Sequence, residues 1–380
     1  MDMGRRQGEE EEEEEEERQR ILAVLSTYYG IDDCSQLLRL SSGLINTTYK
    51  VTTARRPRSS YIFQKINSSV FIEPRKIDEN LRALSEWLRT SSPSDSPSDT
   101  DRFAFPLPTF CGTASTTDCR NSTLVCQGGC FYRVFPYIDN SYTITKVVCE
   151  AQCFAAAKSF GFQTYMFKDF DIRTLHTTIE DFHNLIVIFN KYSTILETGN
   201  SDRIAECGDI IALMENFSYI VSRYKDFISS PFTKLRVTHH DTKISNVLFN
   251  CQTHDVAAVI DLDTTFPGYF LSDVGDMIRS YVSNCDEDDD NYDSICVDKS
   301  RILAIKSGYL TFMNNLLTDF EKSHFYFSGE LLIYMQAIRF FSDYLSNDQY
   351  YSIKYTKHNL VRTRNQLTLL QRYVKIVKEL

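Results

Sequence analysis

Two short segments near the middle of the chain carry the residues best suited to chemistry. The first fits the pattern H-x-D-x-x-x-x-N, with Asp241 and Asn246 as its polar members, and runs into an apolar stretch. Fifteen residues after Asn246, a second apolar stretch ends in Asp261 and Asp263. Phosphoryl transfer needs a carboxylate that orients the attacking hydroxyl, and hard oxygen ligands for Mg²⁺. An aspartate and an asparagine on one loop, with an aspartate after the next strand, can supply these groups.

Each half of this pattern also has a purely structural interpretation. A lone H-x-D sequence arises often by chance, and Asp-x-Asp can be a simple turn after a buried strand. The two halves occur together, and each adjoins an apolar stretch that is typical of a strand. The combination therefore predicts a kinase that uses ATP and Mg²⁺, with Asp241 at its centre.

The elements predicted around these segments fall into two groups. β-type residues at 37–40, 47–51, 61–66, 124–126 and 131–135 predict strands, and helical spacing at 21–29 and 73–88 predicts two amphipathic helices. From Lys146 onward helical patterns dominate, and the two segments that carry the aspartates interrupt them as short strands. We therefore expect a small β-rich part followed by a larger helical part.

Composition and charge exclude several classes of function. The formal net charge of the 380-residue chain is −10, but the nine consecutive glutamates Glu9–Glu17 account for nearly all of it. A basic footprint for nucleic acid is absent, and no apolar run approaches the roughly 20 residues of a membrane span. The first 20 residues are polar and acidic, which indicates neither a signal nor a transit peptide. We expect a cytoplasmic protein with reduced cysteines and with neither nucleic acid nor membrane as a partner.

The catalytic segment resembles that of the aminoglycoside phosphotransferase and choline kinase superfamily, relatives of protein kinases that act on small molecules. Further blocks are similar to one branch, the N-acetylhexosamine 1-kinases, which phosphorylate the anomeric hydroxyl of GlcNAc or GalNAc. These blocks lie at 42–49, 61–67, 132–138, 175–179, 181–184, 275–279, 339–345 and 358–360. The resemblance implies an α+β, protein-kinase-like fold of two lobes. The small β-rich N-lobe would hold a five-stranded sheet, and the larger C-lobe would be mainly helical.

We expect the chain to divide into three parts. Residues 1–20 are predicted to be a disordered acidic tail, and 21–138 to be the nucleotide-binding N-lobe. Residues 139–380 are predicted to be the helical C-lobe with the catalytic and metal loops. A Ser/Pro/Asp-rich stretch at 90–101 is expected to be a flexible insertion. The cysteines at 111–130 do not have the paired spacing of a zinc site.

The resemblance also assigns roles within the catalytic segment. Asp241 matches the catalytic base, and Asn246 and Asp261 match the Mg²⁺ ligands. Asp263 could hold a second ion or a water, or have neither role. His239 is expected to brace the loop as a buried histidine rather than to touch the substrate.

Backbone groups in two N-lobe segments are expected to contact ATP. The loop around Ser42 and Gly43 could cover the phosphates with its N–H groups, although a single glycine makes a weak phosphate-loop pattern. Adenine is expected to lie against the connection that contains Tyr137 and Ile138. Pro136 supplies no N–H donor there, which makes the hydrogen-bond pattern of this connection unusual.

The phosphate-binding cation is expected on the third strand, as in kinases. Lys65 is the chemically competent candidate, with Glu79 or Glu73 on the following helix as its partner. Gln64 is adjacent and points to the opposite face of the strand. Which of the two residues faces the phosphates stays open, and an exposed Lys65 is the structural alternative.

Three residues in branch-like blocks are candidates for contact with the acceptor. A neutral sugar offers no charge, so it must be held by hydrogen-bond donors and acceptors. Asn46, Arg339 and Tyr350 carry such groups. Arg339 is surrounded by apolar residues on its predicted helix, and the alternative is a buried ion pair with Asp343 at i+4.

These observations predict an ATP- and Mg²⁺-dependent phosphotransferase that acts on a small hydroxylated metabolite. The favoured acceptor is an N-acetylhexosamine at its 1-hydroxyl. One alternative is a kinase of the same superfamily with another acceptor, such as choline, ethanolamine or another sugar. A choline-type acceptor would favour an aromatic and acidic cage around its cation. A second alternative is a catalytically silent binding protein that keeps the fold.

Overall fold

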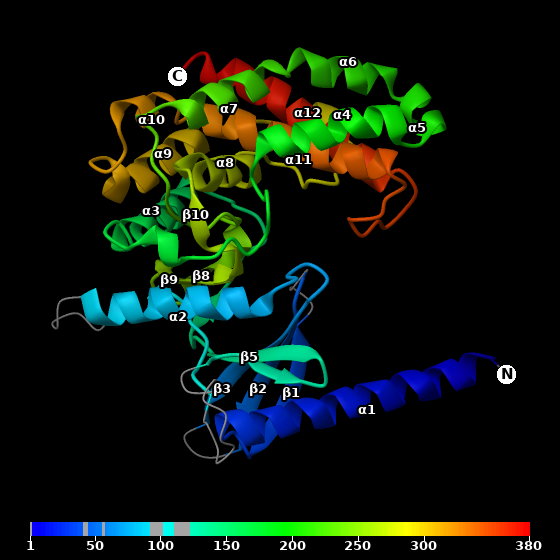
Figure 1. The fold of residues 1–380 in the computed structure, drawn as a ribbon, viewed down its shortest axis with the longest axis vertical. Helices are drawn as coiled ribbons and strands as arrows, with labels where there is room; N and C mark the ends of the chain where they lie inside the picture. Colours follow the sequence, from blue (N-terminus) through cyan, green and yellow to red (C-terminus); the bar gives the residue numbers. More distant parts are fainter. Residues whose placement is uncertain (1, 41–44, 55–57, 92–101, 110–121) are drawn as a thin grey trace. The chain divides into compact units, whose positions relative to one another are not determined.

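The computed structural model describes residues 2–40, 45–54, 58–91, 102–109 and 122–380 (Figure 1). The chain forms two compact units, one of residues 1–140 with 174–179 and one of residues 141–173 with 180–380. We call the first unit the N-lobe and the second the C-lobe. Each has its own secondary structure and its own buried residues.

The N-lobe is built on a five-stranded antiparallel sheet, as predicted, with the strand order β1-β2-β3-β5-β4. The strands are β1 (Cys34–Leu40), β2 (Thr47–Thr53), β3 (Ser60–Ile66), β4 (Val125–Gln127) and β5 (Cys130–Pro136). In Figure 1 the sheet lies between the helices α1 (Asp2–Tyr29) and α2 (Pro74–Ser91). Alternate strand residues such as Val51, Phe63 and Val134 form a core with Val24 and Leu25 of α1.

Helix α1 begins at Asp2, which differs from the prediction of a disordered tail over residues 1–20. Glutamate is a good helix former, so the acidic run can extend a helix that is already anchored on the sheet. Neighbouring turns also contact each other. Gln19 Nε2 donates to Glu15 Oε1 at 2.7 Å, and Arg18 Nη1 lies 3.6 Å from the same oxygen. The last glutamates of the run therefore belong to a helix that packs on the N-lobe.

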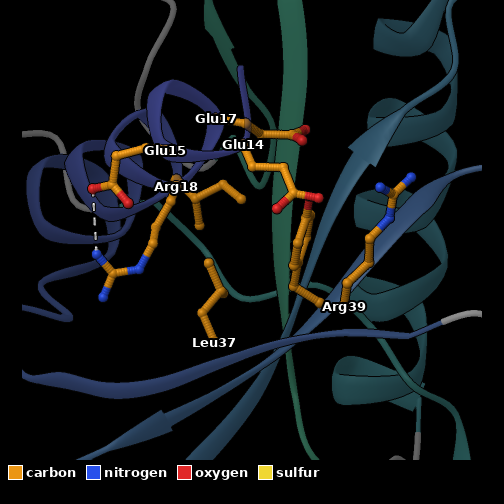
Figure 2. A pocket seen from close by; sticks show the side chains of 8 residues that line it. Glu14, Glu15, Glu17, Arg18, Leu37 and Arg39 are labelled. Atoms are coloured by element: carbon orange, nitrogen blue, oxygen red, sulfur yellow. Dashed lines mark ion pairs between the residues drawn. The ribbon is translucent and has the colours of Figure 1, made fainter. Parts of the chain in front are cut away.

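A polar pocket of about 300 Å³ lies between α1 and the first two strands (Figure 2). Its lining residues are Glu14, Glu15, Glu17, Arg18, Ile21, Leu37, Arg39 and Tyr49. Burial and the carboxylate of Glu17 raise the pKa of Tyr49 to about 12. Among the described residues, none to which the sequence assigns a functional role lines this pocket.

Residues 174–179 belong to the N-lobe, although the sequence places them in the C-lobe. The reason is a pair of hydrogen bonds to α2. Asn80 Nδ2 donates to the carbonyl oxygen of His176, and the backbone N–H of His176 donates to Asn80 Oδ1, both at 2.8 Å. Because the Asn80 side chain is buried, these bonds satisfy an amide that would otherwise be costly to enclose.

The C-lobe is mainly helical. Its helices are α3 (Glu150–Met166), α4 (Leu185–Thr198), α5 (Ser201–Glu206), α6 (Gly208–Asn216), α7 (Tyr219–Ser229), α8 (Phe270–Tyr281), α9 (Lys299–Met313), α10 (Asp319–Ser323), α11 (Phe327–Leu345) and α12 (His358–Val377). Helices α8 and α11 approach closely because Gly275 has no side chain. A Cβ there would overlap the carbonyl oxygen of Ser328. Among the described helices, none is long and apolar enough to cross a membrane.

Short strands interrupt the helices of the C-lobe, as predicted. Strands β7 (Arg236–Thr238) and β10 (Phe266–Gly268) pair with each other, and β6 (Ser141–Tyr142), β8 (Val247–Asn250) and β9 (Val256–Val259) form a second small sheet. Single 3₁₀ turns lie at η3 (Ile172–Thr174), η4 (Ile244–Asn246), η5 (Leu262–Thr264) and η6 (Tyr292–Ser294). The H-x-D segment connects β7 to β8, and Asp261 follows β9.

Candidate active site

The loop between β7 and β8, called the catalytic loop here, is anchored to the first turn of α8. The backbone N–H groups of His239 and His240 donate to Asp273 Oδ2 and Oδ1, at 3.2 and 2.8 Å. Thr242 Oγ1 donates to the carbonyl oxygen of Asp273 at 2.8 Å. Burial raises the pKa of Asp273 to about 7. The helix therefore fixes the backbone on both sides of Asp241. The sequence analysis did not single out Asp273.

His239 braces the catalytic loop from within the C-lobe core. Its ring is 1% exposed and lies edge-on to Phe160, with 5.2 Å between ring centroids. Nδ1 accepts the backbone N–H of Asp241 at 3.2 Å, and Nε2 lies 3.1 Å from the carbonyl oxygen of Ile260. A ring nitrogen that accepts an N–H carries no proton, so His239 is neutral with its proton on Nε2. This is the bracing role expected from the sequence.

The Asp241 carboxylate has two fixed donors and remains partly open to solvent. Lys243 Nζ lies 2.7 Å from Oδ2, and Asn246 Nδ2 donates to the same oxygen at 3.0 Å. Burial by itself raises the pKa of Asp241, but the ammonium of Lys243 and the amide of Asn246 outweigh it, so the pKa lies below its ordinary value. The Asp241 side chain is 24% exposed. An ionised, accessible carboxylate can orient an incoming hydroxyl.

Lys243 is a site residue that the sequence analysis did not single out. The sequence did contain a signal for it, because Lys243 lies two residues after Asp241 in the same loop. Burial lowers the pKa of Lys243, whereas the carboxylates of Asp241 and Asp261 raise it, and the net shift is upward. Asp261 is 20 residues after Asp241 in the sequence, yet its carboxylate acts electrostatically on the ammonium that contacts Asp241.

The candidate metal ligands have the oxygen chemistry that Mg²⁺ requires. Asn246 donates through Nδ2 to Asp241, which turns its carbonyl oxygen Oδ1 away from that contact. Asp261 is exposed and has a left-handed backbone with φ 61°, whereas Asp263 is 2% exposed. No group of three or more His, Cys, Asp or Glu side chains among the described residues could hold a metal alone. Mg²⁺ does not need such a group, because one or two carboxylates, waters and phosphates commonly complete its shell.

Lys65 and Gln64 lie on opposite faces of the N-lobe sheet. Lys65 pairs across the sheet with Tyr132, whose ring belongs to the core beneath α1. Its Nζ lies 4.0 Å from Glu17 Oε1 of that helix. Gln64 faces the other way, and its Oε1 accepts from Nε and Nη2 of the buried Arg133 at 3.1 and 2.8 Å.

The predicted pairing of Lys65 with Glu79 or Glu73 is wrong. Glu79 lies 2.8 Å from His176 Nε2, and Glu73 pairs with Lys76 at i+3. The physical reason is the direction of the Lys65 side chain. It points to the face that α1 covers, whereas both glutamates belong to α2 or its start, on the other side of the sheet (Figure 1).

The other N-lobe candidates have mixed positions. Ser42 and Gly43 lie outside the described residues, as does most of the predicted insertion, 92–101. Asn46 is buried, and its Oδ1 accepts the backbone N–H of Asn67 at 3.0 Å. The N–H of Tyr137 donates to the carbonyl oxygen of Ser60 at 3.1 Å, while Ile138 is half-buried beside it. The N–H of Tyr137 is therefore already in use.

The alternative ion pair between Arg339 and Asp343 does not form. The Asp343 carboxylate instead accepts from the backbone N–H groups of Gln349, Tyr350 and Tyr351 and from Asn359 Nδ2. Arg339 points elsewhere. It donates to the carbonyl oxygen of Phe182, and its guanidinium carbon lies 5.1 Å from the centroid of the Phe182 ring. The side chain of Tyr350 is 72% exposed.

A second half-buried arginine, Arg279, joins two carboxylates in the same lobe. Its Nε and Nη2 donate to Asp276 Oδ1 at 3.1 and 2.8 Å, and its Nη1 donates to Glu287 Oε1 at 2.7 Å. Burial lowers the pKa of Arg279, and the two carboxylates outweigh burial and raise it. Asp276 and Arg279 both act electrostatically on Arg339, which groups these residues in one part of the C-lobe.

Comparison with known proteins bears on both the loop and the fold. Residues 220–295, which include Asp241, Asn246 and Asp261, match the model of the phosphotransferase enzyme family. Similar solved structures include an aminoglycoside phosphotransferase from Alicyclobacillus acidocaldarius, with 13% identity, a TM-score of 0.59 and coverage of 94% of this chain and 95% of that chain. The chain has the fold of the aminoglycoside phosphotransferases.

Two further solved structures with this fold are named as kinases of amino alcohols. A choline kinase from Streptococcus pneumoniae has 12% identity, a TM-score of 0.53 and coverage of 96% of this chain and 100% of that chain. A Plasmodium vivax ethanolamine kinase has 10% identity, a TM-score of 0.55 and coverage of 93% and 89%. These likenesses confirm the predicted α+β, kinase-like fold, with a small β-rich lobe and a larger helical lobe.

Proposed function

We propose that this protein is an ATP- and Mg²⁺-dependent phosphotransferase whose acceptor is the 1-hydroxyl of an N-acetylhexosamine. The observation that carries the proposal is the Asp241 carboxylate. It is ionised, partly accessible, and held by Lys243 and Asn246 in a loop anchored on α8. Asp261 acts electrostatically on the Lys243 ammonium that contacts this carboxylate. This is the set of groups that phosphoryl transfer to a hydroxyl needs, and the fold is one shared with small-molecule kinases.

The nucleotide and the metal are supported by proteins of the same fold. An amicoumacin kinase has been solved with AMP-PNP and Ca²⁺, and a spectinomycin phosphotransferase with ADP. In the present protein Asn246 and Asp261 would hold Mg²⁺, with Asp263 as a further candidate. When bound, Mg²⁺ would neutralise the negative charge that develops on the phosphates during transfer.

Asp241 would act on the acceptor hydroxyl. The oxygen of that hydroxyl bonds to the γ-phosphorus of ATP while the bond from this phosphorus to the β,γ-bridging oxygen breaks, and ADP leaves with that electron pair. The hydroxyl proton passes to the Asp241 carboxylate. A base with a lowered pKa suits a loose transition state, in which the acceptor oxygen loses its proton late. The protein therefore contributes mainly orientation and charge.

The N-lobe would supply the nucleotide contacts. Ser42, Gly43, Tyr137 and Ile138 are the proposed backbone contacts for the phosphates and for adenine. Lys65 is the proposed phosphate-binding cation from the sequence, and that role requires its contact with Glu17 to open. Arg133, on the Gln64 face of the sheet, is the alternative cation. Glu79 is the partner of neither Lys65 nor Arg133, because its carboxylate contacts His176.

The charges near Arg339 favour a neutral acceptor. Asp276 and Glu287 are already neutralised by Arg279, and the half-buried Arg339 adds a second cation to the same region. An ammonium acceptor would have to displace these arginines or lie among them. Within the described part of the chain, the buried Asp276 Oδ2 accepts no hydrogen bond. It could accept one from a sugar hydroxyl. Asn46, Arg339 and Tyr350 remain the proposed sugar contacts.

A kinase of an amino alcohol is the second candidate. It is favoured by the choline, ethanolamine and aminopropanol kinases among the proteins of similar fold. The two candidates differ in the charge of the acceptor. They share Asp241, the metal ligands and the nucleotide.

A coupled ADP-release assay with Mg·ATP would separate these candidates. The informative pairs are GlcNAc with glucosamine and GalNAc with galactosamine, because each pair differs chiefly by an acetyl group that removes the positive charge. Choline and ethanolamine complete the panel, and Asp241→Asn is the control. Turnover on the acetylated sugars, lost in Asp241→Asn and giving the 1-phosphate by NMR, is the expected result. Turnover only on amines would reject the sugar. No turnover together with no Mg²⁺-dependent thermal shift by ATP would indicate a silent binding protein.

A further inference from the structure

Ser272, in the first turn of α8, lies between two imidazole rings. Its Oγ is 2.7 Å from His240 Nδ1 and also contacts His183 Nδ1 at hydrogen-bonding distance. A hydroxyl has one proton, so Ser272 donates to one of these nitrogens and accepts an N–H from the other. Burial lowers the pKa of His240 to about 3 and the pKa of His183 well below its ordinary value. The three side chains form a chain of two hydrogen bonds between neutral rings.

One end of this chain is the catalytic loop. His240 precedes Asp241 and has a left-handed backbone, with φ 68°. This conformation is unfavourable for a residue with a Cβ, so the surroundings must maintain it. The His240 ring stacks on Phe266 with centroids 4.2 Å apart, and a Cβ at Gly268 would overlap the ring. The position of the imidazole therefore sets the backbone that directs Asp241.

The other end lies in the segment that Arg339 contacts. The His183 ring stacks on the ring of Phe182, with centroids 4.4 Å apart and 13° between planes. The carbonyl oxygen of Phe182 accepts a hydrogen bond from Arg339. Ser272 thus connects the proposed acceptor-binding arginine to the loop of the proposed base, entirely within the C-lobe.

We propose that Ser272 is a positioning residue for phosphoryl transfer. By bridging His183 and His240, its hydroxyl holds the left-handed turn that aims Asp241 at the acceptor. The inference rests on the proposed function for its catalytic consequence, whereas the bridge itself is a property of the fold. The competing interpretation is that Ser272 only fills space in the first turn of α8.

A double-mutant cycle separates positioning from filling of space. Ser272→Ala should lower kcat by about ten-fold to a hundred-fold with little change in the KM for Mg·ATP, because small misplacements of a catalytic group cost this much. Ser272→Thr keeps the hydroxyl and should restore most of kcat. Glycine adopts the left-handed conformation freely, so in a His240→Gly background Ser272→Ala should have little further effect. Should His240→Gly not fold, His240→Asn serves, since asparagine also tolerates this backbone.

Two kinetic outcomes would overturn the positioning role. One is a Ser272→Ala protein with wild-type kcat. The other is a pair of losses that multiply in the double variant, because independent defects combine in that way. Circular dichroism and thermal melting of each variant would confirm that the comparison is between folded proteins.

The tautomers of the two histidines provide a measurement that needs no turnover. The chain has seven histidines, so ¹⁵N-edited NMR can be assigned with the His183 and His240 variants. The bridge requires a proton on Nδ1 of one ring and none on Nδ1 of the other. This Nδ1 proton should exchange slowly with water, and Ser272→Ala should abolish that protection. Turnover without this signature would reject the bridge. The signature in a protein with no turnover on any acceptor would leave the bridge standing and reject the catalytic role together with the proposed function.

Discussion

Replacing Lys243 by methionine should raise the pKa of Asp241, because it removes the cation that holds this pKa down. Methionine keeps most of the apolar stem and removes the ammonium that lies 2.7 Å from Asp241 Oδ2. A hydrogen bond between charged groups contributes about 1.5–3 kcal/mol. Because the Lys243 side chain is 33% exposed and water screens it, the lower end applies. Loss of this stabilisation of the charged form makes protonation of Asp241 easier, so its pKa moves upward.

The pH dependence of kcat/KM measures this shift, because that ratio reports ionisations of the free enzyme. In the proposed mechanism the ionised Asp241 is the active form. Activity should therefore fall at low pH, and the acidic limb of Lys243→Met should lie at higher pH than that of wild type. Lys243→Arg keeps a positive charge and is the matched control, with a smaller shift expected. Carboxyl ¹³C NMR, with Asp241→Asn to assign the signal, gives the same pKa directly. Coincident acidic limbs for wild type and Lys243→Met would refute the assignment of Lys243 as the group that holds this pKa down.

The remaining predictions concern the stability of the C-lobe. Arg236→Met should lower the free energy of unfolding by about 3–5 kcal/mol, measured in urea, because it leaves the fully buried Glu321 carboxylate without its cation. Gly275→Ala should cost about 1–3 kcal/mol through overlap with α11, whereas Gly208→Ala, which meets nothing within 4 Å, should be neutral or stabilising; thermal melting compares the two. Asp273 holds its proton up to about pH 7 when folded but releases it near its ordinary value of 3.8 when unfolded. Its contribution to stability is therefore full below about pH 4 and is lost as the pH rises to 7. The measured quantity is the free energy of unfolding of wild type minus that of Asp273→Asn. This difference should fall by up to about 1.4 kcal/mol per pH unit over that interval. A difference that stays flat with pH would contradict the raised pKa.

Local patterns accounted for much of the N-lobe. The strand β3 was predicted at 61–66 and begins one residue earlier, at Ser60, because alternation of side chains is a property of neighbouring residues. The helix predicted at 73–88 corresponds to α2, Pro74–Ser91. Residues 1–20 were predicted to be a disordered tail from their charge alone. Their helical form depends on an anchor further along the chain, since the apolar residues of α1 that join the N-lobe core, Ile21, Val24, Leu25 and Tyr29, lie in its C-terminal turns.

The direction of a side chain within the fold was harder to infer. Alternation indicated that Gln64 and Lys65 point to opposite faces, yet it could not indicate which face α1 would cover. For this reason Lys65 was assigned a partner in α2, whereas its contact is Glu17. Arg339 is a similar case. The i+4 rule offered Asp343, but the loop that follows α11 folds back and occupies that carboxylate with its own N–H groups.

By itself the sequence determined that Asp241 and Asn246, the residues proposed to carry the chemistry, lie in one short loop. Asp241 and Asn246 are five residues apart, and so short a loop can bring their side chains together. Only the tertiary structure decided what holds that loop in place. Asp273, which accepts its backbone N–H groups, and Ser272, which bridges His183 to it, come from separate segments. Contacts across such separations arise from the packing of whole helices, and no local spacing encodes them.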